Sequence, residues 1–464
     1  MNLIVLCIDS LRQDHVSFYN PDSPVETTNI DRVAARSAAF DNVYPEALPT
    51  IPIRTALMTG QRTLTSRPWK PLNRDDHTIV DLLAEYGYRS ALIADTYHYF
   101  KPGYNFHRGF DVWRWIRGQE YDPFRSAALK RYKLEDHINE NYPPDWPPLV
   151  EASLKNLEPL REPEEYFAPQ VIHEAMDWLE ANKDRDQLFL WMDCFDPHEP
   201  WWPPEKFNNF TDPDYRGKQY LLPPGGQAAN YFDQAEIEHI RGLYAGEVAM
   251  VDHYLGELFD AMERWGLFEN SVVLFLADHG HPLADHGKFL KGPDRMYSEL
   301  LKVPAFIHFP GGEWGGTRSD ALGLFHDLPV TLLDALGLGN NAEAFQGHSL
   351  LPLVRGERDS IRESIITGFH EGIDRCIRDR RWSYIRRPPG QKDELYDLKE
   401  DPRETNNLIS DRPEVAERLA SQHGLIYETG RAAHGVMGEY ETEGTAAGAA
   451  SDRLDFHDDG TGAG

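Results

Sequence analysis

The chain has 464 residues, enough for a large α/β core or for two to three domains. It carries 47 Lys and Arg against 76 Asp and Glu, a formal net charge of −29. Such a surface repels nucleic acid and anionic membranes, so neither is an expected partner. No run of 18 apolar residues predicts a membrane span, and the start lacks the basic segment and cleavage signal of a secretory leader. We therefore expect a cytoplasmic location.

Short apolar segments alternate with longer amphipathic ones along most of the chain. The run 3–8 predicts a buried strand that ends at Asp9. Capping residues and helical periodicity predict a helix at 29–39, capped by Asn29, and another at 78–87. Further helices and strands are predicted in chain order, with strands at 90–95, 188–194, 272–278 and 305–309 and helices at 169–182, 235–265 and 328–336.

This alternation predicts a mostly parallel sheet sandwiched by helices, in one catalytic α/β domain over residues 1–363. Residues 99–166 are rich in aromatic and charged side chains and are predicted to be an insertion that shapes a pocket. Short strands at 364–429 followed by a helix predict a small antiparallel α+β domain. The Gly- and Ala-rich stretch 430–464 predicts a disordered tail.

Two apolar runs, 3–8 and 272–278, carry acids at their carboxyl ends that are candidate metal ligands. Asp9 follows "LCI", and Asp278 and His279 follow "LFLA". Ligands of open α/β sheets bind at the carboxyl ends of strands, so these side chains form a candidate site for a divalent metal. Asp9 alone would be read as a helix cap, but Asp278-His279 is more specific, because charged groups there need a partner or a metal.

The segment "ALPTIPIRTALMTG" contains a hydroxyl at Thr50 and a guanidinium at Arg54, with Pro49 and Pro52 stiffening the loop. A helical turn starting at Arg54 would make an anion site from a helix N-terminus and an arginine. An ordinary capped turn with a surface arginine is the alternative.

Two further candidate side chains, His198 and Lys291, lie in loops that follow predicted strands. His198 lies in "FDPHEPWWPP", where a packing histidine is equally expected, and Lys291 lies in "DHGKFLKG", where a solvated lysine is the usual fate. The neighbouring Trp201 and Trp202 suggest an aryl, sugar or lipid-like group beside the anion, or simple core packing.

These motifs together resemble the sulfatase family of the alkaline phosphatase superfamily, in order and over nearly the whole chain. The segments that carry the resemblance include "IVLCIDSLRQDHVSFY", "TIPIRTALMTG" in the Cys/Ser-x-Pro-x-Arg frame, "FDPHEPWWPPEKF", "LADHGHPLADHGKFLKG" and "ELYDLKEDPRETNNL". The resemblance implies one divalent metal held by Asp9, Asp278 and His279, with Thr50 against it as nucleophile. It also implies that Arg54 orients Thr50 and neutralises the anion, and that His198 and Lys291 contact the transferred group and leaving oxygen. His286 matches a family motif without a defined role.

Thr50 departs from this family pattern. Sulfatases use a formylglycine made from Cys or Ser, and threonine lacks the CH2 group that this conversion requires. We therefore expect no formylglycine, and a plain alcohol that attacks phosphorus and forms a phospho-threonine.

The expected metal ligands also differ from the family pattern. Ser10 stands where many sulfatases have a second carboxylate, and His279 where some have Asn. These differences favour Mn²⁺ or Zn²⁺, with Ca²⁺ still an option. Arg62, after the signature, is an uncertain substitute for a group usually found there.

The leading hypothesis is a metal-dependent hydrolase that cleaves a small anionic phosphate mono- or diester through Thr50. The alternatives are a sulfuric ester hydrolase and an anion-binding pseudoenzyme. A two-metal phosphodiesterase is a variant of the first, with further ligands from Asp196, His198, His326 and Asp327. The sequence does not determine the oligomeric state.

Overall fold

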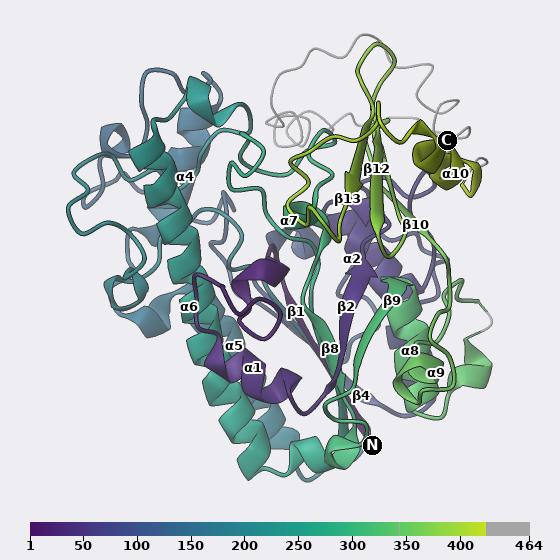
Figure 1. Cartoon of the computed structure of the whole chain (residues 1–464). Helices are drawn as coiled ribbons and strands as arrows, with labels where there is room; N and C mark the ends of the chain where they lie inside the picture. The colour runs from purple at the N-terminus through teal and green to yellow at the C-terminus, as the bar shows by residue number, and fades with distance from the viewer. Residues whose placement is uncertain (343, 424–464) are drawn as a thin grey trace, which may run out of the picture.

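The computed structural model describes residues 1–342 and 344–423, and an eight-stranded sheet lies at its centre (Figure 1). The strand order is β5-β4-β6-β1-β7-β8-β2-β9. In chain order the strands are β1 (Asn2–Ile8), β2 (Ala38–Tyr44), β4 (Arg89–Ala94), β5 (Val112–Trp115), β6 (Leu188–Cys194), β7 (Ser271–Ala277), β8 (Ala305–His308) and β9 (Arg318–Leu324).

Strands β5, β4, β6, β1 and β7 run parallel to one another, and β2 is parallel to β9, whereas β8 is antiparallel to both of its neighbours, β7 and β2. The predicted mostly parallel sheet is therefore confirmed, with one reversed strand. β1, β6 and β7 are buried along their whole length. This explains why their sequences are continuous apolar runs, as expected for strands covered on both faces.

Helices cover both faces of this sheet. Figure 1 shows α1, α5 and α6 together on one side and α8 and α9 on the other. The larger helices are α1 (Thr28–Ala34), α2 (Thr50–Thr59), α3 (Ile79–Glu85), α4 (Trp146–Leu157), α5 (Phe167–Asn182), α6 (Gln234–Arg264), α8 (Asp327–Ala335) and α10 (Pro413–Ser421), and the short ones are α7 (Ser298–Leu301) and α9 (Leu351–Val354).

Local capping explains several helix starts. Thr78 and Asp81 form a capping box at α3, and Asp233 and Glu236 form one at α6. The predicted helix at 29–39 is too long, because α1 ends at Ala34 and the residues from Ala38 already belong to β2. Its N-cap is Thr27 rather than Asn29.

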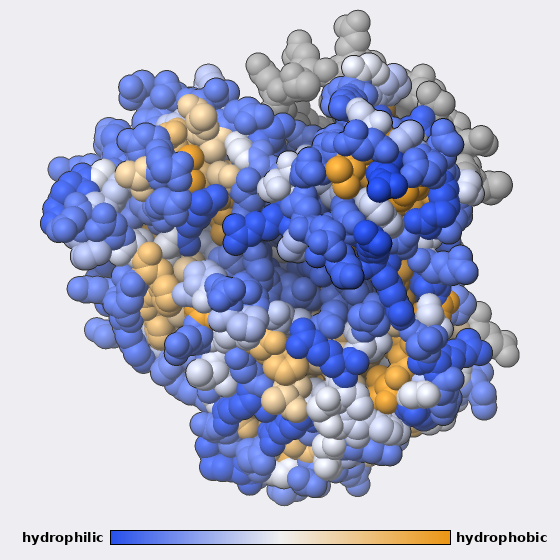
Figure 2. All heavy atoms as spheres, viewed as in Figure 1, coloured by the Kyte–Doolittle hydropathy of each residue, from blue (hydrophilic) through white to orange (hydrophobic). Residues whose placement is uncertain are grey.

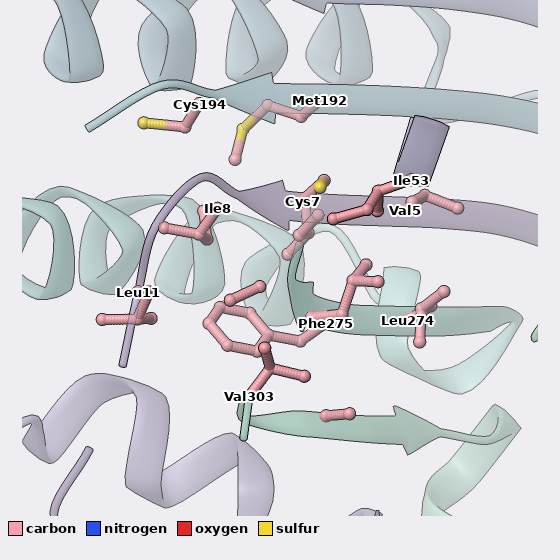
Figure 3. Packing of buried hydrophobic residues seen from close by; sticks show 14 of the residues in the cluster. Val5, Cys7, Ile8, Leu11, Ile53, Met192, Cys194, Leu274, Phe275 and Val303 are labelled. Atoms are coloured by element: carbon pink, nitrogen blue, oxygen red, sulfur yellow. The ribbon is translucent and has the colours of Figure 1, made fainter. Parts of the chain in front are cut away.

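The core lies between the sheet and the two helical layers. Figure 3 shows side chains of β1, β6 and β7 packed together, with Cys7 and Cys194 among them. Both thiols are buried and free, as is Cys376. These cysteines therefore behave as small core side chains.

A second sheet contains β10 (Ile365–Phe369), β11 (Arg375–Arg378), β12 (Trp382–Arg386) and β13 (Glu394–Asp397), which pair antiparallel. Its fifth strand is β3 (Ala47–Leu48), which pairs parallel with β10. The short strand that leads into Thr50 is thus held by the C-terminal part of the chain, and residue 363 does not separate two independent sheets. The insertion predicted at 99–166 also contributes β5, an edge strand of the main sheet. The predicted tail at 430–464 lies outside the described residues.

The face drawn in Figure 2 is mostly hydrophilic, with small separated hydrophobic areas, consistent with the acidic composition. Among the helices of the described ranges, we find none with the length and apolar character needed to cross a membrane.

Candidate active site

Three carboxylates meet at the carboxyl ends of adjacent parallel strands. Asp9 follows β1, Asp278 follows β7, and Asp193 is the penultimate residue of β6. Ile8 is opposite Ala277, so Asp9 and Asp278 follow their strands at the same level of the sheet. Asp193 is opposite Cys7, two residues before Asp9. All three are completely buried.

Asp9, Asp278 and His279 form a group that can hold a metal ion. One ligand atom from each lies within 4.8 Å of the others. Asp9 Oδ2 and His279 Nε2 are buried and make no hydrogen bond among the described residues, although Asp9 Oδ2 lies 3.0 Å from Arg54 Nη2. Two oxygens and one imidazole nitrogen fit a divalent transition metal, so the predicted ligands come together as expected.

The tautomer of His279 suits this role. Its Nδ1 lies 2.8 Å from the carbonyl oxygen of Gly280 and must carry the proton to donate that bond. Nε2 is then unprotonated, and it lies 3.3 Å from Asp278 Oδ2. Burial lowers the pKa of His279 to about 4, so the ring is neutral at physiological pH.

Ser10 supplies no carboxylate but orients two of the predicted ligands. Its hydroxyl lies 2.9 Å from Asp9 Oδ1, and its backbone N–H donates to Asp278 Oδ1 at 3.0 Å. Ser10 adopts a φ of 60°, an uncommon value for a residue with a side chain. This left-handed conformation turns the N–H towards Asp278.

Arg54 lies in the middle of the carboxylates. Its Nη2 lies 3.0 Å from Asp9 and 2.9 Å from Asp193, and its Nη1 pairs with Asp278. Three carboxylates against one guanidinium leave an excess of two negative charges in a fully buried site. Burying uncompensated charge is costly, and one divalent cation would balance this excess.

The pKa shifts of Asp9 and Asp278 fit this charge imbalance. Burial, and after it the charge of Asp278, raises the pKa of Asp9 well above its usual range. Burial also acts to raise the pKa of Asp278, but Arg54 outweighs it and the net shift is downward. A bound cation would favour the ionised form of both.

Thr50 is the first residue of α2, and Arg54 follows one turn later on the same face. The sequence suggested a helical turn that starts at Arg54, but the helix begins one turn earlier, at Thr50. Pro52 is tolerated because it lies in the first turn, where no intrahelical N–H bond is lost. Every residue of α2 is buried, and Gly60 (φ 62°) ends the helix, with Phe345 only 2.5 Å from where a Cβ would be.

Asp193 is a site residue that sequence reasoning missed. Its carboxylate accepts hydrogen bonds from Thr96 and Tyr99, both at 2.7 Å, as well as from Arg54. It therefore fixes the guanidinium against the metal ligands. The signal was present in "LFLWMDC", another apolar run that carries an acid near its carboxyl end.

His198 and Lys291 form a second group. His198 Nε2 lies 2.8 Å from Lys291 Nζ, and His198 Nδ1 lies 2.7 Å from the carbonyl oxygen of Glu199. His198 packs against Phe195 with ring centroids 4.0 Å apart. The structure brings these two sequence candidates together and adds two residues that the sequence analysis did not name. The Glu199 carboxylate lies 3.4 Å from Lys291 Nζ and 3.6 Å from His281 Nδ1.

Other sequence candidates have structural partners. His286 pairs with Glu299 at 2.6 Å, and Arg62 pairs with Glu46. Trp201 is fully buried and donates to the Pro197 carbonyl, so it packs in the core rather than facing a ligand.

The further ligands considered for a second metal do not gather around one point. Asp327 accepts hydrogen bonds from Arg362 and from the backbone of Leu324 and His348. Within residues 1–342 and 344–423, Asp9, Asp278 and His279 are the one group with metal-ligand spacing.

Comparison with known proteins identifies the family of this chain. The family described as "Sulfatase" matches residues 1–338, and the family "N-sulphoglucosamine sulphohydrolase, C-terminal" matches residues 284–425. The chain therefore belongs to the sulfatase family, whose members are ester hydrolases of the alkaline phosphatase superfamily.

Its relatives are distant but cover nearly the full length. An arylsulfatase of Clostridium perfringens is 25% identical, over 90% of this chain and 92% of its own. A multifunctional alkaline phosphatase superfamily protein of Trinickia caryophylli is also 25% identical, over 88% and 91%. The crystal structure of a phosphonate monoester hydrolase of Agrobacterium radiobacter has a TM-score of 0.69 at 20% identity, over 92% of this chain and 96% of its own. The last comparison confirms the alkaline-phosphatase-like fold.

Proposed function

We propose that this protein is a metal-dependent hydrolase of a phosphate mono- or diester, with Thr50 as the nucleophile. The observation that carries the proposal is the place of Thr50: an alcohol at the buried start of α2, one turn before the arginine that binds all three site carboxylates. Relatives that include an arylsulfatase and a phosphonate monoester hydrolase support ester hydrolysis and leave the transferred group open.

The residues divide into two sets. Asp9, Asp278 and His279, with the Thr50 hydroxyl, would hold the divalent ion, which when bound supplies a Lewis acid and favours the Thr50 alkoxide. Thr50 releases its hydroxyl proton to solvent, and its Oγ1 forms a bond to phosphorus while the bond from phosphorus to the leaving oxygen breaks. The leaving oxygen takes a proton from the pair made by His198 and Lys291.

The resulting phospho-threonine is then hydrolysed. Water attacks phosphorus, the bond to Thr50 Oγ1 breaks, and the electron pair returns to that oxygen. Water gives up one proton, which restores the proton lost from the His198–Lys291 pair. The N–H groups at the start of α2 favour negative charge near Thr50 throughout.

Mn²⁺ or Zn²⁺ fits the site better than Ca²⁺. The group offers an imidazole nitrogen and only two carboxylates, because Ser10 stands where a third could be. Calcium prefers a cage of six to eight oxygens. Calcium is the alternative if water or substrate oxygens complete such a cage.

Sulfate transfer is the second candidate, favoured by the match to sulfatases. Threonine cannot form the aldehyde through which a sulfated formylglycine releases its sulfate. A sulfated Thr50 would have to be cleaved by attack at sulfur, so we expect slow turnover of sulfate esters.

The decisive experiment compares an aryl phosphate monoester, an aryl phosphodiester and an aryl sulfate. Metal-stripped protein is reloaded with Mn²⁺, Zn²⁺ or Ca²⁺ before each assay. We expect turnover of a phosphate ester that is lost in Thr50→Ala. Thr55→Ala is the matched control, because Thr55 is a buried threonine of the same helix whose hydroxyl bonds to Ile51.

Three outcomes would contradict this proposal in different ways. Full activity of Thr50→Ala would remove Thr50 as the nucleophile. Turnover of the sulfate alone would support a sulfuric ester hydrolase. Anion binding without turnover of any ester would support a pseudoenzyme.

A further inference from the structure

Glu199 is a buried acid placed between two groups of the active site. Its side chain is only 6% exposed. Both carboxylate oxygens lie 3.4 Å from Lys291 Nζ, and Oε2 lies 3.2 Å from His198 Nδ1. The carboxylate is thus almost equally close to both members of the pair that faces the leaving oxygen in the proposed reaction.

The hydrogen bonds of this pair define where its protons are. Lys291 is a donor, so His198 Nε2 must accept at their 2.8 Å contact. His198 Nδ1 must then carry the ring proton, because it faces the carbonyl oxygen of Glu199. In this arrangement the ammonium of Lys291 holds the one mobile proton, and His198 Nε2 has none to give until it takes that proton.

We propose that Glu199 is a positioning residue that allows Lys291 and His198 to share this proton and deliver it to the leaving oxygen. The inference rests on the proposed hydrolysis. When the proton moves from Lys291 Nζ to His198 Nε2, the amine becomes neutral and the imidazole becomes a cation. Because Glu199 is near both, its charge stabilises the proton at either position, and the final transfer places it on the oxygen that has kept the electron pair of the broken ester bond.

Other charged and titratable groups also face Glu199. His281 Nδ1 lies 3.6 Å from Oε2, and neither ring nitrogen of His281 makes a hydrogen bond among the described residues. Glu120 raises the pKa of Glu199 by repulsion, and Tyr121 feels the Glu199 charge. Burial is the largest effect and raises the pKa of Glu199 to about 7, partly offset by Lys291.

The test is a series of phosphate esters whose leaving alcohols differ in pKa, assayed with Glu199→Gln. Glutamine keeps the size of the side chain and removes its charge. We expect kcat for esters of poorly acidic alcohols to fall about 10- to 100-fold. General acid catalysis contributes about 10²- to 10⁴-fold, and losing a residue that only positions the acid should remove part of it. Esters of 4-nitrophenol, which departs without a proton, should change less than about twofold.

The pH profile provides a second readout. Loss of a nearby negative charge lowers the pKa of the protonated pair, so the alkaline limb of kcat/KM should move about one pH unit lower. KM should change little, because in this proposal Glu199 acts on the proton shared by His198 and Lys291 and not on the substrate. A merely structural role would not produce an effect that depends on the leaving group.

Two further variants complete the design. Glu199→Asp draws the carboxylate back by one methylene. It should cause a smaller fall in kcat that is again confined to esters of poorly acidic alcohols, and it keeps the test valid if Glu199→Gln does not fold. Glu247→Gln is the matched control, a buried glutamate that accepts a hydrogen bond from the backbone N–H of Trp202.

If Glu199→Gln loses activity equally on every ester, or on none, the proposed role of Glu199 is overturned. Turnover by the wild-type protein in the same assays would still support the proposed hydrolysis. Complete inactivity of the wild-type, metal-loaded protein would instead contradict the proposed hydrolysis itself.

Discussion

Arg54 Nη2 lies 2.9 Å from Asp193 Oδ1, so a completely buried ion pair joins α2 to the third strand from the edge of the main sheet. The same guanidinium contacts Asp9 and Asp278, which are candidate metal ligands. Asp193 therefore acts on the site through Arg54. It holds the arginine in place, and it adds the charge that makes the site attractive to a divalent ion.

Replacing Asp193 should damage both stability and metal binding. Asp193→Asn leaves Arg54 with one fewer buried counter-charge, and breaking a buried pair in this way costs about 3–5 kcal/mol. Thermal unfolding should show that loss, and calorimetry should show weaker binding of Mn²⁺ or Zn²⁺. Asp186→Asn, an exposed acid just before the same strand, is the control. Unchanged stability and metal affinity in Asp193→Asn would contradict this account of the site.

Metal content tests the ligand set directly. We expect one divalent ion per chain in reloaded wild-type protein and a rise in melting temperature with metal concentration. Loss of an outer-shell partner typically costs 10- to 100-fold in metal affinity, so His279→Ala should cost more than about 100-fold. His326→Ala should have no effect, because His326 lies outside the group. Two ions per chain, or an effect of His326→Ala, would favour a two-metal site.

The sequence predicted the buried strands well because continuous apolar runs have few alternatives in an α/β protein. Asp9, Asp278 and His279 were predicted from the rule that ligands gather at the carboxyl ends of such strands. Asp193 was missed because its run was read as a strand and not as a strand with an acid at its end. The direction of β8 depends on which strands pair with it, and no local pattern encodes that choice.

Some site features depend on contacts between distant segments. The tautomer of His198 follows from Lys291, 93 residues away in sequence. The pairing of β3 with β10 places the C-terminal sheet beside Thr50, although the two strands are separated by more than 300 residues. An aromatic loop can line a ligand pocket, so the sequence suggested that Trp201 faces a ligand. In the structure, Trp201 instead packs against Tyr244 and His281.

The nature of residue 50 can be tested by restoring the family signature. Thr50→Cys, produced together with a formylglycine-generating enzyme, creates the sequence that such enzymes act on. We expect mass spectrometry to detect the aldehyde and the assay to detect release of sulfate from an aryl sulfate. Thr50→Ala produced in the same way is the control. Aldehyde without sulfate release would indicate that groups beyond Thr50 exclude sulfate esters.

His286 should make stability depend on pH in the alkaline range. Burial lowers the pKa of His286, but its hydrogen bond and charge interaction with Glu299, and then its contact with the Glu404 carbonyl, raise it to about 9. Tyr297 also stacks on the ring, with centroids 3.7 Å apart. Because the folded-state pKa lies above the ordinary value of 6.5, this stabilisation is fully present below pH 6.5 and is lost as pH rises through about 9.

Urea unfolding between pH 6 and 10 measures this contribution. Wild-type protein should lose stability towards pH 10, and His286→Gln should be less stable at pH 6 and show a flatter profile. His173→Gln, which removes a partly exposed histidine that also pairs with a glutamate, should keep the wild-type profile. Glu404 also binds Arg378 of β11, so His286 stabilises the contact between its own segment and the C-terminal sheet. An identical pH profile in wild-type and His286→Gln protein would show that His286 is neutral in the folded chain.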